Sequence, residues 1–112
     1  MVELTGSEKG LIEKYCQRLR GEFPGQVEQI LLFGSHARGA AEPQSDIDLL
    51  IVLKSQERQL KRQVLDLAWE VMSDYGFKAF LSPIVFFKKD YDWYQRWNSS
   101  FLTNVSQDAI FL

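Results

Sequence analysis

Residues 31–53 read LLFGSHARGAAEPQSDIDLLIVL, and this stretch decides how the rest of the chain must be organised. One apolar run ends at Gly34-Ser35, a small polar loop follows, and Asp46-Ile47-Asp48 opens a second apolar run. Short apolar runs rich in Leu, Ile and Val, bounded by turn residues, predict buried β-strands. We therefore expect strands over 27–33 and 46–53, each bordered by polar residues. The second strand is expected to be central, because both of its faces are apolar beyond the aspartates.

Asp46 and Asp48 are candidate metal ligands. Successive side chains of a strand point to opposite faces, so these two carboxylates share a face and lie about 5–7 Å apart. Two like charges at that separation repel unless a cation lies between them. Mg²⁺ suits the arrangement, because it commonly takes one or two carboxylates together with phosphate oxygens of a substrate. The alternative is a solvated strand entrance in which Asp46 belongs to a turn.

Gly34 and Ser35 supply the other half of such a site. Glycine lets the backbone approach a ligand closely. Ser35 offers a hydroxyl and a backbone N–H at the start of a predicted helical turn, where anions bind well. Arg38, in the same turn, has two equal interpretations: a contact to phosphate, or an ion pair with a nearby carboxylate such as Glu42. We interpret His36 as a surface residue rather than a general base.

With Gly34-Ser35 ten residues before Asp46-Ile47-Asp48, the sequence resembles the DNA polymerase beta-type nucleotidyltransferases. Within that superfamily it most resembles the minimal nucleotidyltransferases, which are short prokaryotic chains often paired with a HEPN-domain protein. Either half of the motif is weak alone, but the two together at the borders of apolar runs are specific. The resemblance implies an α/β fold of the nucleotidyltransferase palm type, with helices packed on a small mixed sheet of three or more strands.

The resemblance also implies an activity and a partner. Asp46 and Asp48 would hold one or two Mg²⁺ ions on the triphosphate of ATP or another NTP, while Gly34, Ser35 and Arg38 bind the phosphates. An acceptor hydroxyl would then attack the α-phosphorus. Minimal nucleotidyltransferases act as antitoxins of HEPN toxins, some by adenylylating a tyrosine. The expected reaction is therefore transfer of AMP from ATP to a HEPN-type partner protein, within a dimer or hetero-complex.

A third strand is predicted over 77–87, where Pro83 favours an edge position or a bulge because proline lacks a backbone N–H. Full nucleotidyltransferases of this type carry a third carboxylate on this strand, but the segment contains no Asp or Glu. Ser82 is a poor substitute for a general base, whose removal commonly lowers a rate about 10²–10⁴-fold. The missing carboxylate is expected to map to Ala79, Phe80 or Leu81.

Helices are predicted on both sides of these strands. Apolar residues recur at helical spacing over 7–22, with Ser7 as N-cap. A second helix is expected to begin after Ser55 and to end at Gly76. Asp90 is expected to cap a short helix, which we expect to be followed by a last helix over 101–105.

The C-terminal third is rich in aromatic residues. A domain of this size cannot bury every one of these rings, and an exposed aromatic patch usually marks a partner surface. We favour an interface over a role in the core or in base stacking. The apolar tail 109–112 must also dock on the rest of the fold. The aromatic residues concerned are Tyr91, Trp93, Tyr94, Trp97 and Phe101.

Composition narrows the function classes. A length of 112 residues fits a single domain, 1–112. A net charge of −2 disfavours a broad nucleic-acid-binding surface. The longest apolar runs are too short to span a membrane, so we expect no membrane association. The single cysteine and the lack of a signal-peptide pattern favour the cytoplasm.

Two functions remain open from the sequence. The first is an enzyme that nucleotidylates a partner, with a relative of the aminoglycoside nucleotidyltransferases as a variant of it. The second is a catalytically impaired subunit that binds a nucleotide and neutralises its partner by contact alone. The missing carboxylate favours the second, and the paired motif favours the first.

Overall fold

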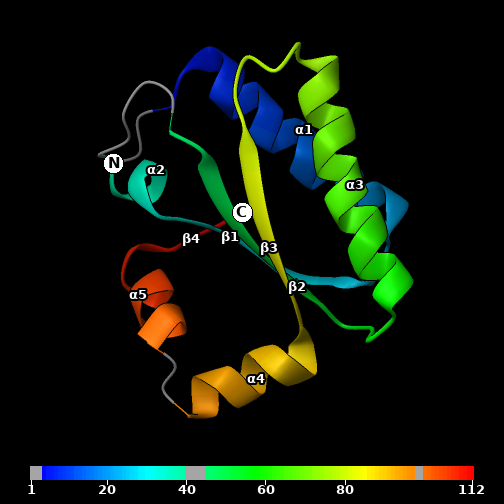
Figure 1. Ribbon diagram of the computed structural model, residues 1–112, viewed down its shortest axis with the longest axis vertical. Helices are drawn as coiled ribbons and strands as arrows, with labels where there is room; N and C mark the ends of the chain where they lie inside the picture. Colours follow the sequence, from blue (N-terminus) through cyan, green and yellow to red (C-terminus); the bar gives the residue numbers. More distant parts are fainter. Residues whose placement is uncertain (1–3, 40–44, 98–99) are drawn as a thin grey trace.

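The computed structural model describes residues 4–39, 45–97 and 100–112. Within them, four strands form one mixed sheet in the order β3-β2-β1-β4 (Figure 1). β1 is antiparallel to β2 and to β4, whereas β3 is parallel to β2. The elements are α1 (Gly6–Glu22), β1 (Val27–Phe33), α2 (Ser35–Arg38), β2 (Ile47–Leu53), α3 (Arg58–Asp74), β3 (Leu81–Phe87), α4 (Lys88–Arg96), α5 (Ser100–Asp108) and β4 (Ile110–Phe111).

Helices cover both faces of the sheet, with α1 and α3 on one side and α4 and α5 on the other (Figure 1). Two hydrophobic cores lie on the two faces of the sheet, and β2 contributes to both because its side chains alternate between the faces. Ile47, Leu49 and Ile51 pack with α1 and α3, while Leu50 and Val52 pack with α4 and α5. All five are fully buried, which confirms that β2 is central. The predicted α/β class with a small mixed sheet is likewise confirmed.

The edges of the sheet agree with two predictions. β3 lies at an edge of the sheet, with no neighbouring strand on the side away from β2. An edge strand tolerates Pro83, because no strand on that side requires the N–H that proline lacks. The apolar tail docks by pairing with β1, since Leu32 lies opposite Ile110 and Leu31 opposite Phe111. The tail thus forms a fourth strand, β4, which lies beside β1 at the edge of the sheet opposite β3.

The predicted third strand is too long, because its first four residues form a loop. Gly76 and Phe77 both have positive φ, +63° and +54°. These two left-handed residues turn the chain out of α3, and the Phe77 N–H donates to the Met72 carbonyl at 3.0 Å. Strand pairing begins only at Leu81.

The predicted first residues of three helices are also wrong by a few positions. Thr5, not Ser7, caps α1, because Glu8 lies three residues beyond it and completes a reciprocal capping box. α3 begins at Arg58 rather than just after Ser55. α4 begins directly where β3 ends, so Asp90 lies in its first turn instead of capping it.

The last helix is longer than predicted, spanning Ser100–Asp108. In the part of the chain described, no helix is both long enough and apolar enough to cross a lipid bilayer.

Candidate functional site

The pairing of β1 with β2 brings the two halves of the motif together. Phe33 lies opposite Asp48, so Gly34 emerges beside the aspartate. Gly34 has φ +75° and ψ −155°, a conformation that is essentially restricted to glycine. A Cβ at this position would lie 3.2 Å from the Asp48 Cγ and closer still to Oδ2. The Asp48 carboxylate therefore packs directly on the Gly34 backbone.

The two aspartates interact electrostatically. Asp48 is partly buried at the start of β2, and Asp46 is exposed just before the strand. Burial raises the pKa of Asp48 above its ordinary value, and the charge of Asp46 raises it further. His36 and Arg38 oppose this by lowering the Asp48 pKa. The site thus concentrates negative charge, which a bound cation would relieve.

The donor set fits Mg²⁺. Two carboxylates at the entrance of one strand leave the remaining coordination positions to water and substrate oxygens, as this ion prefers. Among the described residues, no group of three or more His, Cys, Asp or Glu side chains could hold a metal ion. Asp46 and Asp48 would therefore need ligands from a substrate or from water.

The strand register corrects the predicted position of the missing carboxylate. Asp48 lies opposite Ser82 of β3, and paired residues of neighbouring strands share a face. Leu81 points into the core with α1 and α3, so it cannot face the aspartates. Phe80 precedes the strand, and its carbonyl accepts the Ile47 N–H at 2.8 Å. Ser82, one residue beyond the predicted range, is thus the neighbour of Asp48 on this strand.

Arg38 lies near a different acid from the one suggested by the sequence. Its Nη1 is 3.8 Å from Asp108 Oδ2 of α5, and half of the Arg38 side chain is exposed. Glu42 lies outside the described residues. An exposed pair at this distance contributes at most about 1 kcal/mol, so the guanidinium can exchange Asp108 for a phosphate at little cost. Both interpretations of Arg38 remain compatible with this geometry.

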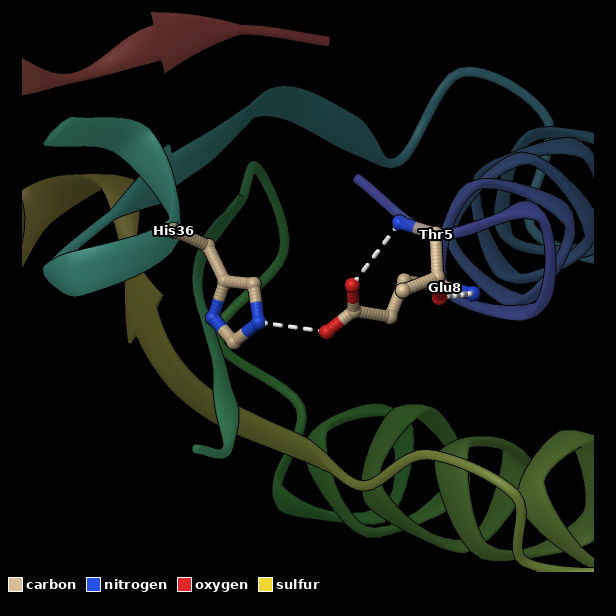
Figure 2. A network of polar contacts seen from close by, with 3 residues as sticks. All are labelled: Thr5, Glu8 and His36. Atoms are coloured by element: carbon tan, nitrogen blue, oxygen red, sulfur yellow. Dashed lines mark hydrogen bonds and ion pairs between the residues drawn. The ribbon is translucent and has the colours of Figure 1, made fainter. Parts of the chain in front are cut away.

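The prediction that His36 is a surface residue is wrong. Its side chain is 1% exposed, and Nε2 lies 2.6 Å from Glu8 Oε2 of α1 (Figure 2). Glu8 Oε1 also accepts the Thr5 N–H at 2.9 Å, which joins the cap of α1 to α2. Because a carboxylate can only accept, Nε2 carries the proton in this contact. His36 therefore fixes the turn that follows Gly34 against the start of α1.

Glu8 should make the stability of the protein depend on pH. Burial acts to raise its pKa, but hydrogen bonds from Thr5 and His36 outweigh burial, so the Glu8 pKa lies below its ordinary value of 4.5. The stabilisation is then present above pH 4.5 and lost as pH falls through the lower folded-state pKa. We expect Glu8→Gln to lower the free energy of unfolding by about 1–2 kcal/mol at pH 7.

Urea unfolding as a function of pH checks this expectation. The curves of wild type and Glu8→Gln should approach each other as pH falls from 4.5 through the folded-state pKa of Glu8. Glu13→Gln, which replaces an exposed acid of the same helix, should follow wild type throughout. A constant difference between wild type and Glu8→Gln down to pH 3 would contradict an ionised Glu8 as its source.

A cavity of about 730 Å³ opens beside Asp46, at the end of the sheet where β2 and β3 begin. The sequence did not single out most of its walls. The Thr-x-x-Glu spacing at Thr5 is a recognisable capping signal, and in the loop before β3 the sequence marked only Ala79 and Phe80, as positions for the missing carboxylate. Its lining residues are Thr5, Ser7, Glu8, Ser45, Asp46, Phe77, Lys78, Ala79 and Phe80.

The C-terminal aromatic residues divide between core and surface. Tyr91 is buried in the core beneath α4 and α5. Trp93 and Tyr94 of α4 and Trp97, which caps the end of that helix, are 41–67% exposed. Phe101 of α5 lies between these extremes, at 39% exposed with its ring 5.9 Å from that of Phe33. The predicted interface thus has a candidate surface on α4.

Comparisons with known proteins place the chain in a family. The model of the family described as a nucleotidyltransferase domain matches residues 11–105. "Putative protein adenylyltransferase MJ0604" of Methanocaldococcus jannaschii is 31% identical over 105 residues, covering 92% of this chain and 95% of that protein. "Putative protein adenylyltransferase MJ1305" of the same organism is 32% identical over 83 residues, or 71% of this chain. The match spans only 55% of that second relative's length.

Two solved structures share the fold. A crystal structure of a mutant of the toxin-antitoxin pair MntA-HpeT has a TM-score of 0.59 and 22% identity, covering 98% of this chain and 72% of that one. A crystal structure described as that of a putative nucleotidyltransferase from Sulfolobus solfataricus has a TM-score of 0.53 and 21% identity, covering 99% and 89%. These similarities agree with the mixed α/β architecture.

Proposed function

The chain belongs to the nucleotidyltransferase domain family, as its motif predicted, and we propose that it transfers AMP from ATP to a hydroxyl group of a partner protein. The observation that carries this proposal is the contact between Gly34 and Asp48, which unites the phosphate-binding and metal-binding halves of the motif. Names of relatives such as MJ0604 support a protein as the acceptor. The toxin-antitoxin pair among the structural neighbours supports a partner protein, which we propose to be of the HEPN type.

Each residue has a distinct role in this proposal. Gly34 and Ser35 hold the β- and γ-phosphates, and Arg38 neutralises their charge. Asp46 and Asp48 would hold Mg²⁺, which would neutralise charge at the phosphate oxygens. The acceptor oxygen forms a bond to the α-phosphorus and releases its proton to water. The bond from that phosphorus to the bridging oxygen breaks, and pyrophosphate leaves with the electron pair toward Ser35. Positioning and electrostatics supply most of the catalysis in such transfers.

The second candidate is a nucleotide-binding subunit that neutralises its partner by contact. The observation that favours it is Ser82, a neutral residue beside Asp48 on β3. The exposed rings on α4 would then supply the contact surface. In this case the Mg-ATP complex binds but no AMP is transferred.

Mg-ATP should raise the melting temperature of the protein under either candidate. At ten times the dissociation constant, a ligand that binds only the folded state adds about 1.4 kcal/mol, or about 5 °C for a domain of this size. Differential scanning fluorimetry with Mg-ATP, ATP plus EDTA, and Mg²⁺ alone measures the shift. No shift at millimolar Mg-ATP would contradict a nucleotide site.

Label transfer separates the two candidates. The protein is incubated with Mg²⁺, ATP labelled at the α-phosphate, and the protein encoded by its neighbouring gene as the candidate partner. The enzyme predicts label on the partner that disappears with Asp46→Asn and persists with Asp66→Asn, an exposed acid of α3. Neutralisation of the partner without label, and insensitive to Asp46→Asn, would support the binding subunit instead.

A further inference from the structure

Helix α3 carries an apolar strip on its outer surface. Its opposite face is buried in the core, whereas Leu65 and Trp69, four residues apart, are 37% and 63% exposed. The Trp69 and Phe77 rings lie 5.0 Å apart, and the Phe77 and Phe80 rings lie 6.1 Å apart. This row of exposed rings ends on the wall of the cavity beside Asp46. Exposed apolar surface of this kind usually marks a contact with another protein.

The charged residues of α3 are separated along its length. The N-terminal half carries only cations and the C-terminal half only acids, with Asp66 at the midpoint. All of these side chains are exposed. In the part of the chain described, none of the cations belongs to an ion pair. The cations are Arg58, Lys61 and Arg62, and the acids of the C-terminal half are Glu70 and Asp74.

This order of charges opposes the dipole of the helix itself. The free N–H groups at the start of a helix favour acids, and the free C=O groups at its end favour cations. α3 has no acid in its first turn and no cation in its last turn, and Glu57 at the N-cap position makes no side-chain hydrogen bond to the helix. Arg18 of α1 lies 3.1 Å from Glu70 and compensates that acid alone. The single chain therefore leaves the charge pattern of α3 largely uncompensated.

We propose that α3 is the interface of a homodimer in which the α3 helices of two copies pack antiparallel across a two-fold axis. The axis passes near Asp66, so the cationic half of each helix lies over the acidic half of the other. Leu65 and Trp69 of both copies pack at the centre, where burial of apolar area stabilises the dimer. Each helix dipole also meets the opposite end of its neighbour, which is favourable.

The charge pattern identifies a second copy, rather than a different protein, as the occupant of this surface. A two-fold interface requires a surface that is complementary to itself, and α3 meets this requirement when two copies run in opposite directions. A parallel pair would place cations on cations and acids on acids. α3 lies along one side of the domain, where a second copy can approach it (Figure 1). This inference does not depend on the proposed nucleotidyl transfer.

Charge reversal in each half of α3 tests the proposal. Sedimentation velocity over protein concentrations from micromolar to submillimolar measures self-association, and wild type is expected to dimerise. Arg58→Glu/Arg62→Glu and Glu70→Lys/Asp74→Lys should each weaken the dimer at least about fivefold, because like charges then face each other. An equimolar mixture of the two variants should dimerise as well as wild type, since each helix again faces its complement.

Two controls address net charge and folding. Lys88→Glu/Lys89→Glu changes the net charge by as much as Arg58→Glu/Arg62→Glu does, also in the first turn of a helix, and should leave the dimer intact. Charge reversal on α3 suits the dipole of that helix, so the α3 variants should fold, and far-UV circular dichroism checks this.

A ring substitution tests the centre of the interface without a change of charge. Trp69→Ala should weaken the dimer about tenfold, because an aromatic side chain at the centre of an interface supplies much of its binding energy. Trp97→Ala removes a ring that is 67% exposed at the end of α4 and should leave the dimer unchanged.

Four results would overturn the proposal. Wild type that stays monomeric at submillimolar concentration has no such dimer. A dimer that withstands both charge reversals, or that persists at full strength in Trp69→Ala, has its interface elsewhere. Two charge variants that stay monomeric when mixed do not pair antiparallel. If wild type is monomeric and Trp69→Ala loses binding to the protein encoded by the neighbouring gene, α3 docks that protein instead.

Discussion

Gly34→Ala should lower the free energy of unfolding by about 2–5 kcal/mol and abolish the melting shift with Mg-ATP. Two effects add at this position. The new side chain cannot adopt φ +75° and ψ −155° without strain, and its Cβ collides with the Asp48 carboxylate. The backbone or Asp48 must therefore move, and either movement separates the two halves of the site.

Gly25→Ala is the matched control for this variant. Gly25 also has φ +75°, but a Cβ there would meet nothing within 4 Å. It should lose only about 1–2 kcal/mol, the cost of a left-handed conformation, and keep the full response to Mg-ATP. Urea unfolding and fluorimetry measure both quantities. If Gly34→Ala retained the Mg-ATP shift, close contact between Gly34 and Asp48 would not be needed for binding.

Asp48→Asn should have opposite effects on the free and the liganded protein. Burial and the neighbouring Asp46 raise the pKa of Asp48, so its charged form is less stable in the folded than in the unfolded chain at neutral pH. Removing that charge should raise the melting temperature of the ligand-free protein. The same change removes a proposed Mg²⁺ ligand, so the Mg-ATP shift should vanish and AMP transfer should fall about 10²–10³-fold.

The opposite signs distinguish a functional role from a structural one. Fluorimetry with and without Mg-ATP, together with label transfer to the partner, gives all three quantities. Asp66→Asn, which removes a charge from the exposed face of α3, should change none of them substantially. A lower melting temperature of ligand-free Asp48→Asn would show that the charged carboxylate stabilises the fold and would remove the electrostatic argument for a cation.

The sequence predicted the architecture well where the pattern of apolar residues within one short segment determines the structure of that segment. The short apolar runs of β1 and β2, rich in Leu, Ile and Val and bounded by turn residues, favoured strands, and the apolar residues on both faces of β2 required cover on both sides. The contact between Gly34 and Asp48 agrees with the motif, which assigned both residues to one site. For the C-terminal tail, the sequence predicted that it docks on the fold but not that it forms a strand. The tail pairs with β1, and only the complete fold brings these two segments together.

The errors arose where distant segments meet. His36 looks exposed in a small polar loop, but α1 brings Glu8 against it from 28 residues away. Phe77 is a local exception: it looks like the start of a strand, yet its N–H bonds to the Met72 carbonyl at the end of α3. The place of Ser82 beside Asp48 depends on a parallel register, and local sequence does not encode the relative shift of two strands.

The sequence by itself determined the fold class, the central strand and the two-part motif, because hydrophobic periodicity and residue chemistry act over a few neighbouring positions. Only the tertiary structure decided that His36 is buried, that Ser82 flanks Asp48, and that exposed rings lead to a cavity at Asp46. Those features require segments far apart in the chain to approach within a few ångströms, and packing of the complete domain is what brings them there.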